Sequence, residues 1–361
     1  ILRKPQIYYW CEDVAMTTLI LTGGGSGGHV VPNIALIPAL REKFNLVYIG
    51  SDGIERDLLK GRGVPYHTVH CTKLVRGSVL KNIAMPFRFL KSVSEAKRAL
   101  AAAGADIVFS KGGYVALPVV LAAKKLKIPV LTHESDLTPG LANKIIARRC
   151  RAVLTSFPDT AKLFANGIYT GAPIRSELLR GDRTEALKKY GFSGKKPVLL
   201  LFGGGSGSLA LNRAAEAALP EILQTFDFLH IRGKHAGAEK REGYVPLEYE
   251  SDMASAYAAA DFVVSRAGSN TVFELLALKK PALLVPLENR RSRGDQLQNA
   301  QYFEKRGLCH ILREPDLSPR TLLGGVRALA ADEKLKQNLA AAPFSAGNGS
   351  IAELICNTAD K

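Results

Sequence analysis

The sequence lacks paired cysteines and long apolar runs. Its five cysteines are scattered singly and none forms a Cys-x-x-Cys pair: Cys11, Cys71, Cys150, Cys309 and Cys356. This spacing argues against a disulfide framework and against a zinc site, and it indicates the reducing cytosol as the compartment. No apolar run reaches the roughly 20 residues of a membrane-spanning helix, so no segment is predicted to cross a bilayer.

Acidic residues are also few. The chain has 33 Asp and Glu residues against 49 Lys and Arg residues, which gives a formal net charge of +16. Nucleic acids and anionic membrane surfaces are the usual partners of such a charge. The sequence has no zinc finger, no RNP-type motif and no basic strand interleaved with aromatic residues, which disfavours nucleic acid. A basic surface that simply faces solvent is the remaining alternative.

Length and composition predict two domains. A chain of 361 residues is long for a single core, and a hydrophobic content of 47% is enough to fill two. Residues 1–15 do not join the pattern that follows, and Met16 stands just before the first predicted strand. We expect residues 1–15 to be a leader outside the fold.

A glycine-rich segment follows the first predicted strand, residues 19–21. It reads Thr22-Gly23-Gly24-Gly25-Ser26-Gly27-Gly28-His29, and residues 30–40 are predicted to form a helix. Glycines let the backbone approach a ligand closely, and a helix N-terminus attracts phosphate. The Lys-Ser/Thr ending of a P-loop is missing, which disfavours an ATPase. The segment ends in His29, which can exchange a proton near neutral pH. The alternative is a tight turn with an incidental histidine.

The same arrangement recurs in the second half of the chain. Residues 198–202 form a buried-strand run, Gly203-Gly204-Gly205-Ser206-Gly207-Ser208 follows, and residues 209–223 are predicted to form one helix. Two phosphate-binding loops indicate either two phosphate-bearing ligands or one ligand held between the domains. The segment Gly171-Ala172-Pro173-Ile174-Arg175 is predicted to be the hinge between the halves.

Short apolar runs alternate with helical stretches along both halves. Further strands are predicted at residues 46–50, 66–69, 106–110, 130–133, 152–155, 226–231, 262–265, 282–286 and 310–312. This alternation predicts an α/β fold with parallel sheets covered by helices on both faces. Sites in such sheets form at the carboxyl ends of strands. The residues of interest are therefore His29, Lys111-Gly112-Gly113-Tyr114 and His133-Glu134-Ser135-Asp136.

Two polar segments of the second half also follow strand ends. Arg266-Ala267-Gly268-Ser269-Asn270-Thr271 opens a predicted helix that carries Glu274 about one turn in. A carboxylate at such a place can accept hydrogen bonds from ribose hydroxyls, although a plain acid on the helix surface is the alternative. Residues 287–296 are strongly polar and more numerous than a turn requires, so we expect a binding loop.

Residues 72–92 combine apolar and basic side chains without any acid. Such a segment suits an anionic bilayer interface. The expected membrane contacts are Leu74, Leu80, Ile83, Met85, Phe87, Phe89, Lys73, Arg76, Lys81 and Arg88. The alternative is a helix packed on its own sheet with its basic residues in solvent.

Taken together, these motifs resemble those of the bacterial MurG family. The resemblance runs from Met16 to near the C-terminus. It is carried by Gly24-Gly25-Ser26-Gly27-Gly28-His29, Gly112-Gly113-Tyr114, His133-Glu134 with Gly140-Leu141-Ala142-Asn143-Lys144, Pro173-Ile174-Arg175, the segment from Arg266 to Glu274, and Asp295-Gln296 with Asn299-Ala300. A single glycine loop would be a weak signal, whereas this ordered set is specific. Two departures are an altered second loop, where the family usually has Gly-Gly-Ser-Gln-Gly, and Asp136, where some members have Asn.

Members of that family are UDP-N-acetylglucosamine:N-acetylmuramyl-(pentapeptide) pyrophosphoryl-undecaprenol N-acetylglucosaminyltransferases of the GT-B fold, with two Rossmann-like domains facing a central cleft. The resemblance implies that residues 16–173 bind the acceptor and the membrane and that residues 174–342 bind the UDP-sugar. A C-terminal helix, about residues 343–361, is expected to pack back on the first domain. The implied acceptor-binding residues are Gly25, Ser26, Gly27, Gly28, His29, Tyr114, Glu134, Asp136 and Asn143. The implied donor-binding residues are Arg175, Gly204, Gly205, Ser206, Gly207, Ser269, Asn270, Thr271, Glu274, Asp295 and Gln296.

The resemblance also implies an inverting glycosyl transfer in peptidoglycan synthesis. The muramoyl 4-hydroxyl of the lipid-linked pentapeptide acceptor attacks the anomeric carbon of UDP-N-acetylglucosamine, and UDP leaves. The expected catalytic residues are His29, Asp136 and Glu134, with His29 the first choice as base and Asp136 the second. No cofactor or metal is expected, and the sequence has no Asp-x-Asp motif. The expected location is the cytoplasmic face of the cell membrane, with cell-wall synthesis proteins as candidate partners and a connection to cell shape and division.

Other enzymes of the same fold are the main alternatives. A diacylglycerol glycosyltransferase is expected to keep the donor motifs but to lack His133-Glu134 and the segment 140–144. A UDP-N-acetylglucosamine 2-epimerase would share the fold and the donor without needing the basic apolar segment. A nicotinamide dehydrogenase is disfavoured because Gly50-Ser51-Asp52 is a weak match to the acid that binds ribose. A nucleic-acid binder rests on net charge alone.

Overall fold

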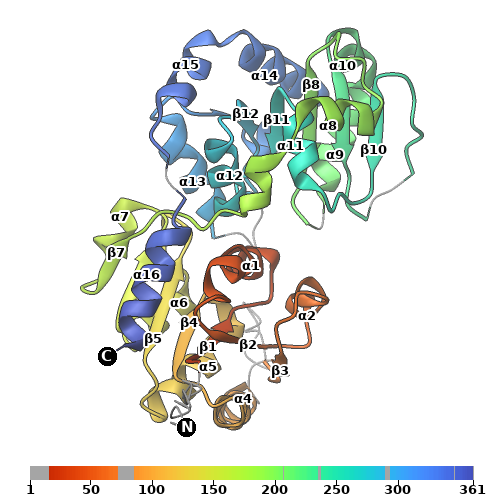
Figure 1. Ribbon diagram of the computed structural model, residues 1–361. Helices are drawn as coiled ribbons and strands as arrows, with labels where there is room; N and C mark the ends of the chain where they lie inside the picture. The colour runs from red at the N-terminus through yellow and green to blue at the C-terminus, as the bar shows by residue number, and fades with distance from the viewer. Residues whose placement is uncertain are drawn as a thin grey trace, which may run out of the picture.

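The computed structural model describes residues 16–71, 85–205, 207–234, 237–288, 293–344 and 346–360. These residues form two α/β domains, each built on a parallel sheet (Figure 1). The described N-terminal sheet has seven strands in the order β3-β2-β1-β4-β5-β6-β7. Their bounds are β1 Thr18–Thr22, β2 Asn45–Gly50, β3 Tyr66–Thr68, β4 Ile107–Ser110, β5 Val130–Glu134, β6 Ala152–Thr155 and β7 Gly167–Tyr169.

The sheet of the C-terminal domain has the order β10-β9-β8-β11-β12-β13 among the described residues. Its strands are β8 Val198–Phe202, β9 Asp227–Ile231, β10 Tyr244–Leu247, β11 Phe262–Ser265, β12 Ala282–Leu284 and β13 His310–Ile311. All pairings between neighbouring strands in both sheets are parallel. The predicted α/β class with two doubly covered parallel sheets is confirmed.

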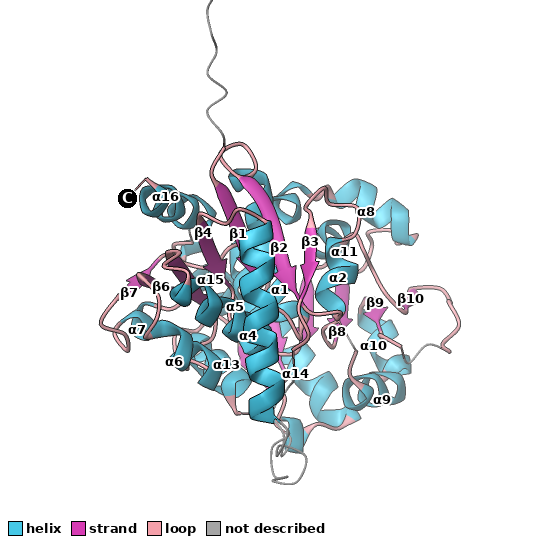
Figure 2. Ribbon diagram, turned by 90° about the horizontal axis from the view of Figure 1, so that it is seen from below, coloured by secondary structure: helices cyan, strands magenta, loops and turns pink. Residues whose placement is uncertain are grey.

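Helices cover both faces of each sheet (Figure 2). In the first domain they are α1 Gly27–Leu40, α2 Ile54–Leu59, α4 Met85–Ala102, α5 Gly113–Lys125, α6 Leu141–Ala147 and α7 Pro158–Ala161. In the second they are η1 Ser176–Arg180, α8 Arg183–Tyr190, α9 Leu209–Ala217, α10 Leu219–Thr225, α11 Met253–Ala259, α12 Ser269–Ala277, α13 Asp295–Glu304, η2 Glu314–Asp316, α14 Pro319–Ala331 and α15 Glu333–Ala341. The last helix is α16 Asn348–Ala359.

Burial on both faces explains why the central strands are continuous apolar runs. All five residues of β1 are buried. Leu19 and Leu21 belong to a core cluster with residues of α1 and α16, whereas Ile20 belongs to the cluster with residues of α4 and α5 on the other face. Because successive side chains of a strand point to opposite faces, a strand between two helical layers has no polar face.

Two details of the predicted elements are wrong. The helix expected over residues 209–223 is divided into α9 and α10, with Ala218 between them and Pro220 in the first turn of α10. Proline lacks the N–H that a continuous helix would need at that point. The short edge strands β7 and β10 were not predicted. None of the three residues of β7 is buried, and β10 has only four residues, one of them Pro246.

The two domains are in direct contact. Phe157, at the start of α7, packs against Phe273, Tyr302 and Phe303 of the C-terminal domain, with ring centroids 4.9, 5.0 and 5.6 Å away. The chain returns to the first domain through α16, which lies beside the N-terminal sheet in Figure 1. Ile351 and Ile355 of α16 are fully buried in the core cluster that includes Leu36 of α1.

Candidate active site

The first glycine loop joins β1 to α1 next to β4, its neighbour in the sheet. This is the place where crossover connections leave in opposite directions, and such switch points form ligand sites in α/β sheets. The side chain of Ser26, the N-cap of α1, makes no capping hydrogen bond. The first-turn N–H groups of a helix have no partner within the helix, so the start of α1 can donate to an anion.

Gly25 is the tightest point of this loop. Its φ angle is +80°, and a Cβ atom there would lie 2.2 Å from Cε1 of Tyr114. Both the positive φ and the close approach require glycine. Tyr114, at the start of α5, therefore lies directly against the loop.

Glu55 of α2 supports the loop from inside the domain. Its side chain is fully buried, and Oε2 accepts the Gly25 N–H over 3.1 Å while Oε1 accepts the Ser51 N–H over 2.9 Å. The carboxylate thus takes one of the loop's backbone donors and holds the loop to α2. The sequence analysis missed Glu55, because a single acid in a short helix resembles an ordinary surface residue.

His29 lies at the end of the loop with one ring nitrogen bound. Nδ1 lies 3.0 Å from the backbone oxygen of Lys111. A carbonyl oxygen can only accept, so Nδ1 carries the proton and Nε2 has the free electron pair. The ring packs on Gly113, where a Cβ atom would lie 2.9 Å from Cδ2 of His29. Burial and the nearby Lys111 ammonium lower the pKa of His29, which keeps the imidazole neutral.

Lys111 follows β4 and is buried beneath His29, with 1% of its surface exposed. Its Nζ donates to Nδ1 of His133 over 2.7 Å and contacts Ser135 Oγ. His133 in turn donates from Nε2 to the Gly171 carbonyl over 3.2 Å. Burial lowers the pKa of Lys111 to about 8, against the opposing effect of Glu134 and Asp136. Residues 111–114 were predicted from the sequence to belong to the site, but the buried hydrogen bonds of Lys111 with His133 and Ser135 were not predicted.

Replacing Lys111 by methionine is expected to move the acidic limb of the pH profile of kcat/KM to higher pH. The neutral imidazole is the active form of a base, and its pKa sets that limb. Lys111 lowers the pKa of His29, so removing the ammonium raises the pKa and the base becomes protonated at a higher pH than in the wild type. Initial rates between pH 5 and 9 measure the shift. The exposed Lys125 of α5 offers a control, since K125M should leave the limb unchanged. A K111M limb at the wild-type position would contradict this assignment.

Glu134 and Asn143 are buried and bound to neighbouring protein groups. Glu134 accepts the N–H groups of Asp136 and Gly140 over 3.0 and 3.3 Å and the Asn143 Nδ2 group over 2.7 Å. Asn143 Oδ1 accepts the Gly113 N–H over 3.4 Å. Burial and Asp136 raise the pKa of Glu134. These contacts make both residues supports of the loops around His29, whereas the sequence analysis expected them to face the acceptor.

Asp136 reaches across to the C-terminal domain. Its Oδ1 accepts Asn299 Nδ2 over 3.1 Å and its Oδ2 accepts Arg293 Nη2 over 3.0 Å. Both carboxylate oxygens of Asp136 thus bind side chains of the C-terminal domain. His29, in contrast, is held through Nδ1 and keeps the electron pair of Nε2 for a substrate hydroxyl.

The second glycine loop joins β8 to α9, next to β11 in the sheet. Gly204 and Gly205 face open space, whereas a Cβ atom on Gly207 would lie 2.3 Å from the Arg232 carbonyl oxygen. Ser206 lies outside the described residues. The side chain of Ser208 caps α9 by accepting the Leu211 N–H over 3.4 Å. The open backbone of the loop is therefore at Gly204 and Gly205.

The start of α12 lies at the junction of the domains, facing α1 (Figure 1). Its N-cap is Gly268, and no side chain caps it. Asn270 Nδ2 donates to the Gly28 carbonyl over 3.0 Å, which joins the two helix starts directly. Ser269 is buried and Thr271 is half-buried. Arg266, also buried, donates to Ser208 Oγ over 2.8 Å and so connects the loops after β11 and β8.

Glu274 is turned inward from α12. Its Oε1 accepts Arg175 Nη2 over 3.0 Å, and its Oε2 accepts the Tyr257 hydroxyl over 3.1 Å. The side chains of Arg175 and Glu274 are 20% and 9% exposed. Burial raises the pKa of Glu274, and Arg175 opposes that rise. Two residues predicted to bind the UDP-sugar, Arg175 and Glu274, thus lie together in the structure. Tyr257 is a third member of this group that was not predicted from the sequence.

Asp295 and Gln296 form the first turn of α13. Oε1 of Gln296 accepts the Leu287 N–H over 3.0 Å, which fixes the loop after β12 to this helix. Residues 289–292 of the polar loop lie outside the described residues. Within the described ranges, no group of three or more His, Cys, Asp and Glu side chains is arranged to hold a metal ion.

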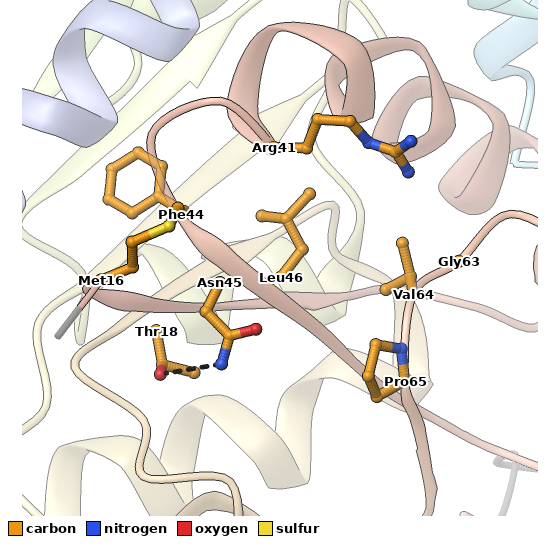
Figure 3. A pocket seen from close by; sticks show the side chains of 9 residues that line it. All are labelled: Met16, Thr18, Arg41, Phe44, Asn45, Leu46, Gly63, Val64 and Pro65. Carbon is orange, nitrogen blue, oxygen red and sulfur yellow. Dashed lines mark hydrogen bonds between the residues drawn. The ribbon is translucent and has the colours of Figure 1, made fainter. Parts of the chain in front are cut away.

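A pocket of about 790 Å³ lies at the amino ends of strands of the N-terminal sheet, opposite the end that carries the glycine loop. Figure 3 shows its apolar lining of Met16, Phe44, Leu46, Val64 and Pro65, with Arg41 at one side. These residues stand at the amino ends of β1, β2 and β3. Because sites of parallel sheets form at the carboxyl ends, this pocket is separate from the glycine loops.

Solved structures with a similar fold include glycosyltransferases. MurG of Acinetobacter baumannii is similar with a TM-score of 0.72 and 26% sequence identity, over 94% of this chain and 99% of that one. The calicheamicin glycosyltransferase CalG4 has the same fold with a TM-score of 0.69 at 14% identity. Two Rossmann-like domains with a glycine loop in each, together with this similarity, assign the chain the GT-B fold of glycosyltransferases.

Sequence comparison gives the family. Residues 19–155 match the glycosyltransferase family 28 N-terminal domain and residues 198–355 match the C-terminal domain. A relative from Lachnospira eligens is 46% identical over 325 residues, which are 88% of this chain and 92% of that protein. A Clostridium botulinum (strain Loch Maree) relative is 44% identical over 349 residues, 94% of this chain and 99% of that protein. Both are named UDP-N-acetylglucosamine--N-acetylmuramyl-(pentapeptide) pyrophosphoryl-undecaprenol N-acetylglucosamine transferase. The chain therefore belongs to the MurG family of glycosyltransferase family 28, and the predicted resemblance is confirmed.

Proposed function

We propose that this protein transfers N-acetylglucosamine from UDP-N-acetylglucosamine to the 4-hydroxyl of a lipid-linked muramoyl-pentapeptide in peptidoglycan synthesis. The observation that carries the proposal is the pair of helix starts at the two switch points, joined by the Asn270–Gly28 hydrogen bond, with His29 beside them. The names of the relatives supply the substrates. The epimerase and diacylglycerol alternatives are not favoured by these relatives.

The reaction is a single displacement in which His29 is the base. Nε2 of His29 takes the proton of the muramoyl 4-hydroxyl as its oxygen attacks the anomeric carbon of the donor. The new C–O bond forms as the bond between the anomeric carbon and the diphosphate oxygen breaks, and attack from the opposite side inverts the anomeric centre. Proton removal by a positioned imidazole typically contributes about 10²- to 10⁴-fold to the rate.

The leaving UDP is stabilised by the C-terminal domain. The backbone of Gly204 and Gly205 and the start of α12 offer N–H groups to the diphosphate. Glu274 accepts from a ribose hydroxyl at Oε2, which has a second acceptor site beside the one that the Tyr257 hydroxyl occupies. Gln296 and Asp295 lie where the sugar would extend toward α13. We propose that no metal is needed, because the backbone dipoles stabilise the diphosphate and Arg175, although paired with Glu274, adds a further donor beside it.

The acceptor's lipid places the enzyme at a membrane surface, and we assign that contact to the start of α4. This helix lies at the surface of the N-terminal domain that is turned away from the C-terminal domain (Figures 1 and 2). Phe87 and Leu90 are 78% and 61% exposed, and Arg88 and Lys91 are exposed beside them. Phe89 packs partly against the core, and Met85 is half-buried. The expected contacts at Leu74, Leu80, Ile83, Lys73, Arg76 and Lys81 lie outside the described residues. No helix of the described residues is long and apolar enough to span a bilayer.

The double variant F87E/L90E is expected to bind vesicles of anionic phospholipid at least about tenfold more weakly than the wild type. Burying each side chain in the interface contributes about 1.5–3 kcal/mol when complete, and the added carboxylates are repelled by the lipid charge. Cosedimentation with vesicles measures the binding. L163E/Y169E changes two other exposed apolar residues of the same domain and should bind as the wild type does. Equal loss in both double variants would exclude a specific contact at α4.

The direct test of the function uses labelled UDP-N-acetylglucosamine and a lipid-linked muramoyl-pentapeptide, with EDTA present. Formation of the disaccharide lipid is the expected result, and it would establish substrate, reaction and metal independence together. Transfer that appears only when Mg²⁺ replaces EDTA would refute metal independence alone. UDP release without the disaccharide product would refute the acceptor assignment.

A further inference from the structure

Helix α13 of the C-terminal domain holds the loop that follows β5 in the N-terminal domain. Asn299 donates from Nδ2 to Asp136 Oδ1 over 3.1 Å, and its Oδ1 accepts the Leu137 N–H over 2.9 Å. The Asn299 side chain is fully buried. A buried amide with both ends bound to one loop fixes that loop, because breaking either bond leaves a buried polar group unpaired.

Arg293 adds an ion pair to the same loop. Its Nη2 atom lies 3.0 Å from Asp136 Oδ2 and 3.5 Å from Asp295 Oδ2. Both carboxylate oxygens of Asp136 are therefore bound by the other domain. On the surface, Thr138 Oγ1 donates to Gln298 Oε1 over 2.7 Å. The loop is thus bound to Arg293 and α13 at three successive residues, through the side chains of Asp136 and Thr138 and the backbone N–H of Leu137.

A series of hydrogen bonds connects the Asp136 loop to the surroundings of His29. The backbone N–H of Asp136 donates to Glu134, and Glu134 also accepts a hydrogen bond from Asn143 Nδ2. Asn143 in turn accepts the N–H of Gly113. The ring of His29 packs on Gly113. Each link is a hydrogen bond between buried or half-buried groups. A displacement of Asp136 would therefore move Gly113, against which the ring of His29 packs.

The same helix faces the other substrate. Asp295 and Gln296, the proposed donor contacts, form the first turn of α13, and Asn299 stands one turn further on. A rigid helix that binds the donor at one end therefore determines where the Asp136 loop lies.

We propose that Asn299 and Arg293 are positioning residues that couple donor binding to acceptor binding through the Asp136 loop. This inference rests on the proposed function for the identity of the two ligands. Coupling of this kind is reciprocal: the donor strengthens acceptor binding by the same factor by which the acceptor strengthens donor binding. Neither residue touches the reacting atoms in this arrangement.

The test is calorimetric titration of a non-transferable donor analogue, UDP-N-acetylglucosamine with CH₂ in place of the anomeric oxygen. It is done with and without a muramoyl-pentapeptide diphosphate that carries a short, water-soluble prenyl chain. For the wild type, the acceptor analogue is expected to tighten binding of the donor analogue at least about fivefold, the lower end of typical coupling. N299A is expected to bind the donor analogue alone within about twofold of the wild type, with the coupling ratio reduced to near one. Q301A changes an exposed residue of the same helix and should keep the ratio.

A reciprocal exchange separates coupling from damage to the fold. N299D places a carboxylate beside Asp136 and should abolish the coupling through repulsion. D136N/N299D restores one amide and one carboxylate across the interface and should recover the coupling, whether or not it recovers turnover. Circular dichroism of each variant checks folding.

A wild-type coupling ratio in N299A would overturn the inference, as would loss of affinity for the donor analogue by N299A in the absence of the acceptor analogue. Failure of the exchange to restore the ratio would also overturn it. Small-angle X-ray scattering of the ligand-free proteins gives an independent result, because N299A/R293A should have a larger radius of gyration than the wild type. If the wild type binds neither ligand, the proposed function fails. An unchanged radius of gyration in N299A/R293A would overturn the coupling independently of that result.

Discussion

Replacement of His29 by alanine is expected to lower kcat by about 10²- to 10⁴-fold, the usual contribution of a positioned general base. The Lys111 carbonyl binds Nδ1 and leaves the Nε2 electron pair available. Burial and Lys111 lower the pKa of the imidazole, which favours its neutral form. Quantification of labelled disaccharide lipid under saturating donor and acceptor measures kcat directly.

UDP binding by H29A is expected to stay within about twofold of the wild type, because the proposed UDP site belongs to the other domain. Calorimetry with UDP alone measures this. His70 offers a matched control, since it is exposed and paired with Glu95 outside the site, and H70A should keep wild-type kcat. A kcat of H29A within about fivefold of the wild type, or an equal loss in kcat and UDP affinity, would rule out His29 as the base.

Much of the fold could be predicted from the sequence because its signals are local. A strand buried on both faces has to be a continuous apolar run, as residues 198–202 are, and all five of them are buried in β8. A glycine loop between such a strand and a helix then marks the carboxyl end of the sheet. The same reasoning could not detect β7, because none of its three residues is buried. It also missed β10, whose four residues include Pro246, a residue that argues against a strand.

The supports of the site could not be predicted, because they depend on contacts between distant segments. Asp136 and its partners Arg293 and Asn299 are 157 and 163 residues apart in the sequence. Nothing in local spacing distinguishes a polar residue that faces a ligand from one that binds a neighbouring loop. Glu134 shows the difficulty, because it follows the pattern of a ligand-facing acid at a strand end and yet satisfies buried backbone N–H groups.

Replacement of Glu274 by alanine is expected to have the second large effect, on both UDP affinity and stability. Removing one member of a buried ion pair typically costs about 3–5 kcal/mol, because the other charge stays buried without compensation. Here Arg175 would be left and the Tyr257 hydroxyl would lose its acceptor. Thermal unfolding measures the stability, and calorimetry measures UDP binding, which should fall by at least about tenfold. The exposed Glu304 of α13 is a control position, and E304A should match the wild type in both measurements.

A second variant separates the two effects of Glu274. Replacing both members of a buried pair by apolar residues of similar volume is often neutral or stabilising, so R175M/E274L should recover most of the thermal stability lost in E274A. The ribose hydroxyls would still lack their acceptor, and the diphosphate would lack the guanidinium, so UDP binding should stay weak. Recovery of both UDP binding and stability would mean that Glu274 only holds α12 to Arg175 and does not contact UDP. Stability without binding is the expected outcome, because Oε2 of Glu274 accepts only the Tyr257 hydroxyl and retains an acceptor site that the fold itself does not use.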